Sequence, residues 1–127
     1  MTPSWIDETV RAFGRQLGLS AFSLNDRRAA GARFENGFAL YLEYGEGGMM
    51  VSVGLAADGS EATLRKLLAL AHPEAGTGLR LRAVWFERTG EARFIARIDD
   101  RDLSATVLEQ TFRTLWQAAE YFGRSVA

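Results

Sequence analysis

Two stretches of alternating apolar residues constrain the fold of this chain more than any other feature of its sequence. From Phe38 to Leu55 every second residue is large and apolar, apart from the glycine-rich run 45–48 that interrupts the alternation. Residues 79–98 repeat this pattern on either side of a Thr89-Gly90 pair. A period of two directs one face of a strand into a core, and glycine at the break allows the chain to reverse. Each stretch is therefore predicted to form two antiparallel strands.

The segment before these hairpins combines a helical pattern with more alternation. Residues 4–17 are predicted to form an amphipathic helix, with Ser4 as its N-cap and Gly18 as its end. A β region is expected over residues 20–56, and its earliest part alternates at Phe22, Leu24, Ala32 and Phe34. The pair Asn36-Gly37 then predicts a tight turn.

Two further helices complete the pattern. A short helix is predicted over residues 61–71, where leucines recur at helical spacing. A longer helix is predicted over residues 103–122, with Asp102 or Ser104 as its N-cap. The predicted order is α-β-β-β-α-β-β-α, which is an α+β fold with three helices and a mainly antiparallel sheet of about five strands. The length of 127 residues predicts a single domain, 1–127.

Composition excludes several classes of function. The chain has no cysteine, which excludes disulfides and thiolate metal sites, and its net charge of −1 argues against a general nucleic-acid binder. Its longest apolar run is far shorter than the roughly 20 residues of a membrane span. The N-terminus does not resemble a signal peptide. A cytoplasmic protein without membrane insertion is therefore expected.

Candidate chemical groups are few. The only histidine, His72, stands beside Pro73 at a predicted helix end, a position that disfavours a role as catalytic base. The acidic run 99–102 leads into a helix, where acidic residues favour the positive end of the helix dipole, so a calcium loop is disfavoured. The four arginines of a possible basic sheet face are better explained as a solvated surface; they are Arg80, Arg82, Arg93 and Arg97.

The positive signal is an excess of large apolar residues. The predicted strands carry them on both faces, while three helices cover only part of a small sheet. The outward set is Tyr41, Met50, Val84, Phe86 and Ile95. An exposed apolar face calls for a partner, so these residues favour a protein that acts by binding and self-associates.

The whole-chain pattern resembles the class I type III secretion chaperones, the small effector-specific chaperones of bacterial secretion systems. The order of elements carries the resemblance, together with the segments 13–18, 22–26, 38–55, 64–70, 79–98 and 115–122. The resemblance implies a bacterial cytoplasmic homodimer with no enzymatic activity, no cofactor and no metal. It also implies a secreted effector as partner, held through its extended N-terminal segment without nucleotide, and suggests a contact with the secretion ATPase.

The resemblance also assigns residues to two surfaces. The second helix and the fourth strand would form the dimer interface, through Leu64, Leu67, Leu68, Leu70, Val84 and Phe86. Shallow effector-binding grooves would be built from Trp5, Ile6, Phe22, Leu24, Leu40, Leu42, Met49 and Met50, a set that also contains core residues.

Two other functions remain open at this point. One is a small-molecule-binding or sensory α+β domain with a pocket between sheet and helices. The other is a small hydrolase or isomerase that uses a carboxylate such as Asp99 or Asp102, neither of which has a histidine beside it in sequence.

Overall fold

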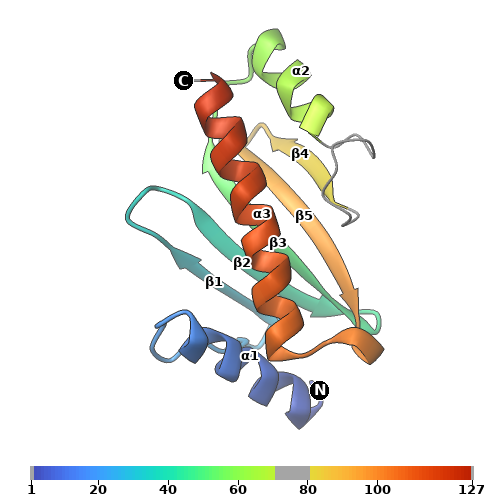
Figure 1. The fold of residues 1–127 in the computed structure, drawn as a ribbon. Coiled ribbons are helices and arrows are strands. Elements are labelled where there is room, and N and C mark those ends of the chain that lie inside the picture. The colour runs from blue at the N-terminus through green and yellow to red at the C-terminus, as the bar shows by residue number, and fades with distance from the viewer. Residues whose placement is uncertain (1, 71–80, 127) are drawn as a thin grey trace.

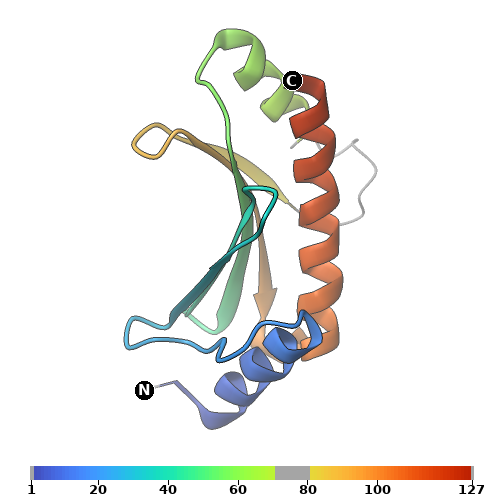
Figure 2. The same cartoon turned by 90° about the vertical axis from the view of Figure 1, so that its left-hand side faces the viewer.

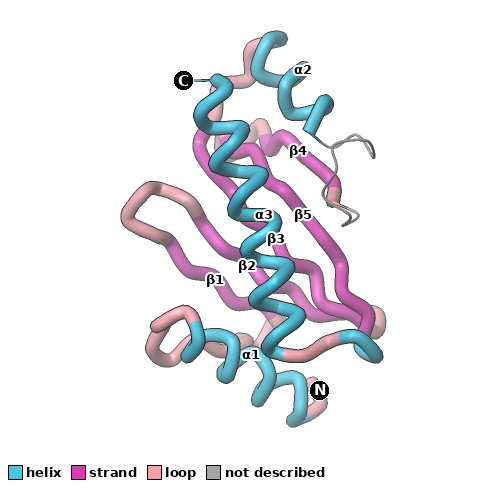
Figure 3. The backbone as a smooth tube through the Cα atoms, in the orientation of Figure 1, coloured by secondary structure: helices cyan, strands magenta, loops and turns pink. Residues whose placement is uncertain are grey.

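The computed structural model describes residues 2–70 and 81–126, apart from the side chains of Leu70 and Val126. The described residues form three α-helices and five strands in the order that the sequence predicts (Figures 1 and 3). Along the chain these elements are α1 Ser4–Gln16, β1 Ala29–Arg33, β2 Ala39–Gly45, β3 Gly48–Ala56, α2 Glu61–Leu70, β4 Arg82–Phe86, β5 Glu91–Asp99 and α3 Ala105–Val126.

The strands form one antiparallel sheet in the order β1-β2-β3-β5-β4. The β2–β3 and β4–β5 hairpins are the two that the alternating patterns predict, and β3 pairs with β5 to join them. In the register, Val51 lies opposite Leu42 on one side and Ala96 on the other, so apolar residues form rows across one face. The fold class is therefore the predicted α+β class.

The helix α3 runs the length of the sheet and covers one of its faces (Figure 2). Helix α1 lies at the end of the sheet where α3 begins, and α2 lies beside the C-terminal end of α3 (Figure 1). The core is the layer between α3 and the sheet. Its fully buried residues include Leu40, Leu42, Val51, Val53, Phe94, Leu108, Leu115 and Phe122.

Two of the predicted helix starts are capped by serine. The Ser104 Oγ accepts a hydrogen bond from the Val107 backbone N–H at 3.1 Å, and the Ser60 Oγ accepts one from the Thr63 N–H at 3.2 Å. The cap predicted for the first helix is wrong. Ser4 is the first helical residue, and the N-cap is Pro3, which makes no side-chain cap bond. Pro3 has an extended backbone, with ψ 142°, and the helical conformation starts at the next residue, Ser4.

The strand predicted around Phe22 and Leu24 is also wrong, because residues 17–28 form a loop. The side chain of Asn25 accepts hydrogen bonds from the backbone N–H groups of Arg27 and Ala29, at 2.8 and 3.1 Å. This local turn uses backbone groups that a strand would need for pairing. The first strand therefore begins only at Ala29.

The face of the sheet away from α3 is not the exposed apolar patch that the sequence suggests. Ile95 is only 8% exposed, and the other four residues of that set are half-buried. Arg82, Arg93 and Arg97 share this face by register, as predicted, whereas Arg80 lies outside the described residues. The guanidinium of Arg93 lies over the rings of Tyr41 and Phe86 and shields part of their surface from water.

Candidate functional site

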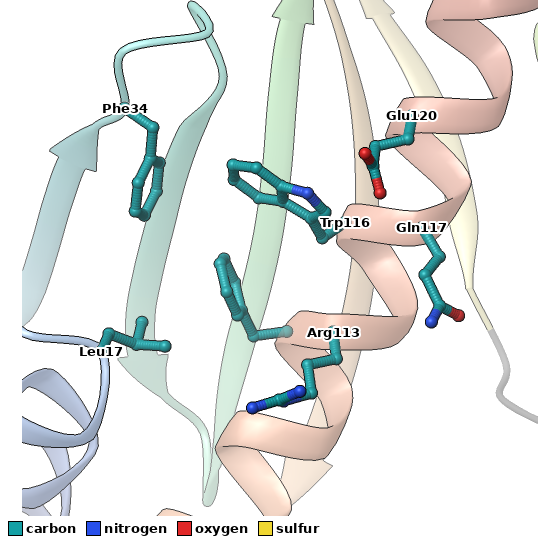
Figure 4. Close-up of a pocket in the computed structure, with 7 residues that line it drawn as sticks. Leu17, Phe34, Arg113, Trp116, Gln117 and Glu120 are labelled. Carbon is teal, nitrogen blue, oxygen red and sulfur yellow. The ribbon is translucent and has the colours of Figure 1, made fainter.

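An aromatic groove lies between the end of α1, the loop after β1 and one side of α3 (Figure 4). It has a volume of about 410 Å3. The name aromatic groove is used below for the surface lined by Leu17, Phe34, Phe112, Arg113, Trp116, Gln117 and Glu120. Leu17 follows α1, Phe34 follows β1 and the other five residues lie on α3, so three separate segments build the groove.

Packed rings form the wall of the aromatic groove. The Phe34 ring lies edge-on to the Trp116 indole, with ring centroids 5.0 Å apart, and Phe112 lies 5.5 Å from Trp116. Phe38 supports the indole from the sheet side at 4.7 Å. The first of these pairs is edge-to-face and the other two are tilted, and aromatic pairs at these centroid distances are favourable, so the rings hold one another in place. Trp116 and Phe34 stay half-buried and present apolar surface to the groove.

The turn at Asn36-Gly37 positions Phe34 against α3. The Phe34 N–H donates to the Phe38 carbonyl oxygen at 2.8 Å, and the Gly37 N–H donates to the Phe34 carbonyl at 3.0 Å. The Asn36 Oδ1 accepts from the Phe38 N–H at 3.0 Å. Gly37 has φ +89°, a backbone conformation that a side chain would disfavour. The predicted turn is confirmed, and it places the Phe34 ring in the lining of the groove.

Polar side chains form the rim. Arg113, Gln117 and Glu120 project from α3 around the rings (Figure 4), and Arg113 pairs with Glu109 one turn earlier at 3.0 Å. An apolar floor with a charged and amide rim suits the side chains of a peptide. The groove lining contains neither histidine nor cysteine.

The eight residues assigned to effector binding do not come together at this groove. Ile6, Leu40, Leu42 and Met49 are fully buried in the core, and Phe22, in the 17–28 loop, is also buried. Leu24 and Met50 are half-buried, and Trp5 on α1 is 42% exposed. Three of the eight therefore reach the surface of the single chain.

The residues assigned to the dimer interface lie on α2 and β4. Leu68 is 68% exposed, Leu67 is buried, and Leu64, Val84 and Phe86 are half-buried. The side chain of Leu70 lies outside the described residues. Leu68, Tyr121 and Trp5 are the large apolar side chains most open to water in the described part of the chain.

The groove residues missed at the sequence level were visible in part. The sequence pattern places Trp116 beside Phe112 on the last helix, and it places Phe34 just before a turn. It predicts that Phe34 and Phe112 belong to the core. Phe112 is buried as expected, but Phe34 is half-exposed. A large aromatic residue beside a turn signal was the available clue. Nothing in the pattern shows that the turn faces α3.

The other candidate groups have structural roles where they are described. Asp99 forms ion pairs with Arg97 at 3.7 Å and Arg101 at 3.9 Å. The Tyr44 hydroxyl donates to Asp100 at 2.8 Å, and this hydrogen bond raises the pKa of Tyr44. His72 lies outside the described residues. Within residues 2–70 and 81–126, no three histidine or acidic residues gather in a way that suits a metal ion.

No helix in the described part of the chain is both long enough and apolar enough to cross a membrane.

The fold and the whole chain have known counterparts. Residues 5–121 match a family model described as type III secretory system chaperone SycN. Among solved structures the chain is similar to a chain of the ExsC–ExsE complex, with a TM-score of 0.83 and 20% sequence identity, over 97% of this chain and 94% of that one. No curated protein matches it significantly.

Two more solved structures show the same fold. One is a chain of the HopA1–SchA chaperone–effector complex, with a TM-score of 0.69 and 21% identity over 96% of this chain and 92% of that one. The other is a chain of the heterodimeric ExoU–SpcU complex from the type III secretion system of Pseudomonas aeruginosa, with a TM-score of 0.66 and 19% identity over 92% and 93%. With the family model covering nearly the whole length, the chain belongs to the type III secretory system chaperone SycN family.

Proposed function

We propose that this chain is a cytoplasmic chaperone that binds the extended N-terminal segment of a type III secretion effector and keeps that effector competent for secretion. The aromatic groove is the observation that carries the proposal, because it presents Phe34 and Trp116 at the surface within a rigid cluster of rings. An apolar pocket with a polar rim accepts one or two side chains of an extended peptide. Family membership favours this function over the ligand-binding and hydrolase alternatives.

The position of β1 supports binding of an extended segment. β1 lies at one edge of the sheet and contains the short sequence Ala29–Arg33, in which only Arg33 has a long side chain. Backbone groups along such an edge are available to a further strand. Because Phe34 directly follows β1, a segment paired with this edge passes beside the aromatic groove. Trp5, Leu24 and Met50 are the remaining candidates for contacts outside the groove.

We also propose that the chain works as a homodimer through α2 and β4. Leu68 supports this proposal, since it is a large apolar side chain left 68% exposed on α2. A second copy of α2 packed against it would remove that surface from water. The proposed mechanism involves only binding, so it uses neither a catalytic group nor a nucleotide. A contact with the secretion ATPase is a further part of the proposal.

The test is to isolate the tagged chain from its bacterium with secretion blocked and to identify its partner. The wild type is expected to hold a secreted protein in a near-stoichiometric amount, and cleavage of the N-terminal stretch of that protein is expected to release it. Recombinant versions of that stretch alone should rebind. Trp116→Gln should lose the partner, because the amide cannot replace the indole in the ring cluster.

Tyr121→Gln is the matched control, because Tyr121 is an aromatic residue on the same helix that is 57% exposed and is not part of the groove. Circular dichroism should show that both variants fold. A wild type that carries no secreted protein would contradict the chaperone function. Equal retention by Trp116→Gln and Tyr121→Gln would contradict only the assignment of the groove.

A further inference from the structure

A second hollow lies where the exposed side of α1 meets the 17–28 loop. It has a volume of about 390 Å3 and is lined by Arg11, Arg15, Leu19, Ser20, Ala21, Phe22 and Ser23. These residues are called the basic hollow below. Unlike the aromatic groove, which has Glu120 on its rim, the basic hollow has no acidic residue in its lining.

The charged groups of the basic hollow have no acidic partner within the described residues. Arg11 and Arg15 stand four residues apart on α1, and both are exposed. Asp7 and Glu8 lie one turn earlier, but no ion pair forms between them and Arg11. Two guanidinium groups and two exposed serine hydroxyls therefore offer hydrogen-bond donors around one concave surface.

The dipole of α1 explains Arg15 better than it explains Arg11. Arg15 lies in the last turn of α1, where its positive charge interacts favourably with the negative end of the helix dipole. Arg11 lies a turn earlier and gains less from the dipole. Its repulsion with Arg15 four residues on is offset only in part by Asp7 and Glu8 one turn before it. A negative charge placed between the two guanidinium groups would relieve this repulsion directly.

The floor of the basic hollow is firmly built. Phe22 packs edge-on against Phe13, with ring centroids 6.2 Å apart. It also lies so close to Gly14 that a Cβ on Gly14 would come within 2.7 Å of the Phe22 Cβ. Ala21 is held at φ +54°, a strained conformation for a residue with a side chain. The loop is thereby fixed over α1, with Leu19 and Phe22 beside the two arginines.

We propose that the basic hollow receives an acidic side chain, Asp or Glu, from the polypeptide that this chaperone binds. The carboxylate would lie between Arg11 and Arg15, and an apolar neighbour in the bound segment would pack on Leu19 and Phe22. Charge complementarity carries this inference, because the lining offers only positive and neutral donors beside an apolar floor. The inference rests on the proposed function and adds a requirement on the sequence of the bound segment.

In the test, peptides that bind the immobilised full-length chain are selected from a random library of short peptides. Peptides retained by the wild type are expected to be enriched in Asp or Glu next to an apolar residue. The variant Arg11→Glu/Arg15→Glu should instead enrich Lys and Arg. The control Arg88→Glu/Arg124→Glu changes the net charge by the same amount at two exposed positions outside the hollow, and it should select as the wild type does.

A second measurement compares one selected peptide with its twin in which Asp or Glu is replaced by Asn or Gln. Fluorescence anisotropy should show about tenfold weaker binding of the amide twin to the wild type, and a difference that shrinks at high salt. The neutral variant Arg11→Gln/Arg15→Gln should bind both twins alike. Circular dichroism should show that it is folded.

The outcomes separate the two proposals. If the wild type retains peptides without enrichment of acidic residues, or if the arginine variants weaken both twins equally, the basic hollow is not an acid-binding site and the chaperone proposal stands. If the wild type retains no peptide at all, this inference fails, whereas the proposed function fails only if the chain isolated from its bacterium carries no secreted protein.

Discussion

The guanidinium of Arg93 lies 4.0 Å from the centroid of the Tyr41 ring, on the face of the sheet opposite α3. The Phe86 ring lies on the guanidinium as well, at 4.3 Å. The Arg93 Nε donates to the Glu91 carboxylate at 2.5 Å, and the Tyr41 hydroxyl donates to the same carboxylate at 3.1 Å. Glu91 is only 6% exposed, so a charged cluster closes this face, which none of the three described helices covers.

Removing one charge of the Arg93–Glu91 pair should destabilise the fold. Arg93→Met keeps much of the apolar stem but leaves the Glu91 carboxylate buried without its cation, at an expected cost of about 2–3 kcal/mol in the free energy of unfolding. Glu91→Gln/Arg93→Met should cost less than Arg93→Met alone. Urea unfolding measures both. Arg101→Met is the control, because its pair with Asp99 spans 3.9 Å at the surface and should change stability by less than about 1 kcal/mol.

Alkaline pH should weaken the same cluster. Burial, the charge of Glu91 and the hydrogen bond to Glu91 raise the pKa of Tyr41 above its ordinary value of 10.0. A raised folded-state pKa gives stability that is fully present below pH 10 and is lost as the pH rises through the folded-state value. Tyr41→Phe should flatten this loss in unfolding measurements across that range. Tyr44→Phe removes a separate contribution, from the bond to Asp100, and should leave the Tyr41 part unchanged.

Gly14 should not tolerate a side chain. A Cβ there would lie 2.7 Å from the Phe22 Cβ, so Gly14→Ala must push the 17–28 loop away from α1. The clash is expected to cost about 1–3 kcal/mol, against a gain of about 1 kcal/mol from helix propensity, so the net change should be destabilising. Gly45→Ala is the control, because a Cβ there meets nothing within 4 Å. Equal thermal midpoints for the two variants would contradict this account of the loop.

Leu68→Asp should separate the proposed dimer into folded monomers. A charge at this exposed position is tolerated by a single chain, but it would be buried and unpaired against a second copy. Light scattering during gel filtration measures the mass, and circular dichroism checks the fold. Trp5→Asp is the control, since Trp5 is exposed on α1 at the other end of the molecule. A variant Leu68→Asp that stays dimeric places the interface elsewhere.

Local patterns were sufficient to predict most of the fold. The alternation at residues 38–55 predicts both strands of the first hairpin, since one side of each strand faces α3. The same reasoning fails at Phe22, because an alternating pattern does not show whether a backbone pairs with another strand. Gly14 and Asn25 decide that question, through a close contact and a local turn.

The candidate site was harder to predict than the fold. Period-two patterns mark Leu40 and Met49 as apolar, but they do not distinguish a core position from a surface groove. The aromatic groove depends on three segments that meet only in the folded chain, at Leu17, Phe34 and Trp116. The outward face of the sheet was misjudged for a related reason. Whether Arg93 lies over Tyr41 or in solvent depends on the register of β2, β3 and β5.

The cover that α3 provides has a consequence for synthesis. A ribosome completes all five strands before it makes α3, so Val53 and Phe94 have no helix over them while the nascent chain lengthens. β3 and β5 also pair across an intervening stretch that contains α2, which makes their joining a late event. The nascent chaperone therefore passes through a stage in which the apolar face of its own sheet is exposed to water. Until Phe122 packs on that face, the chain is itself prone to aggregate.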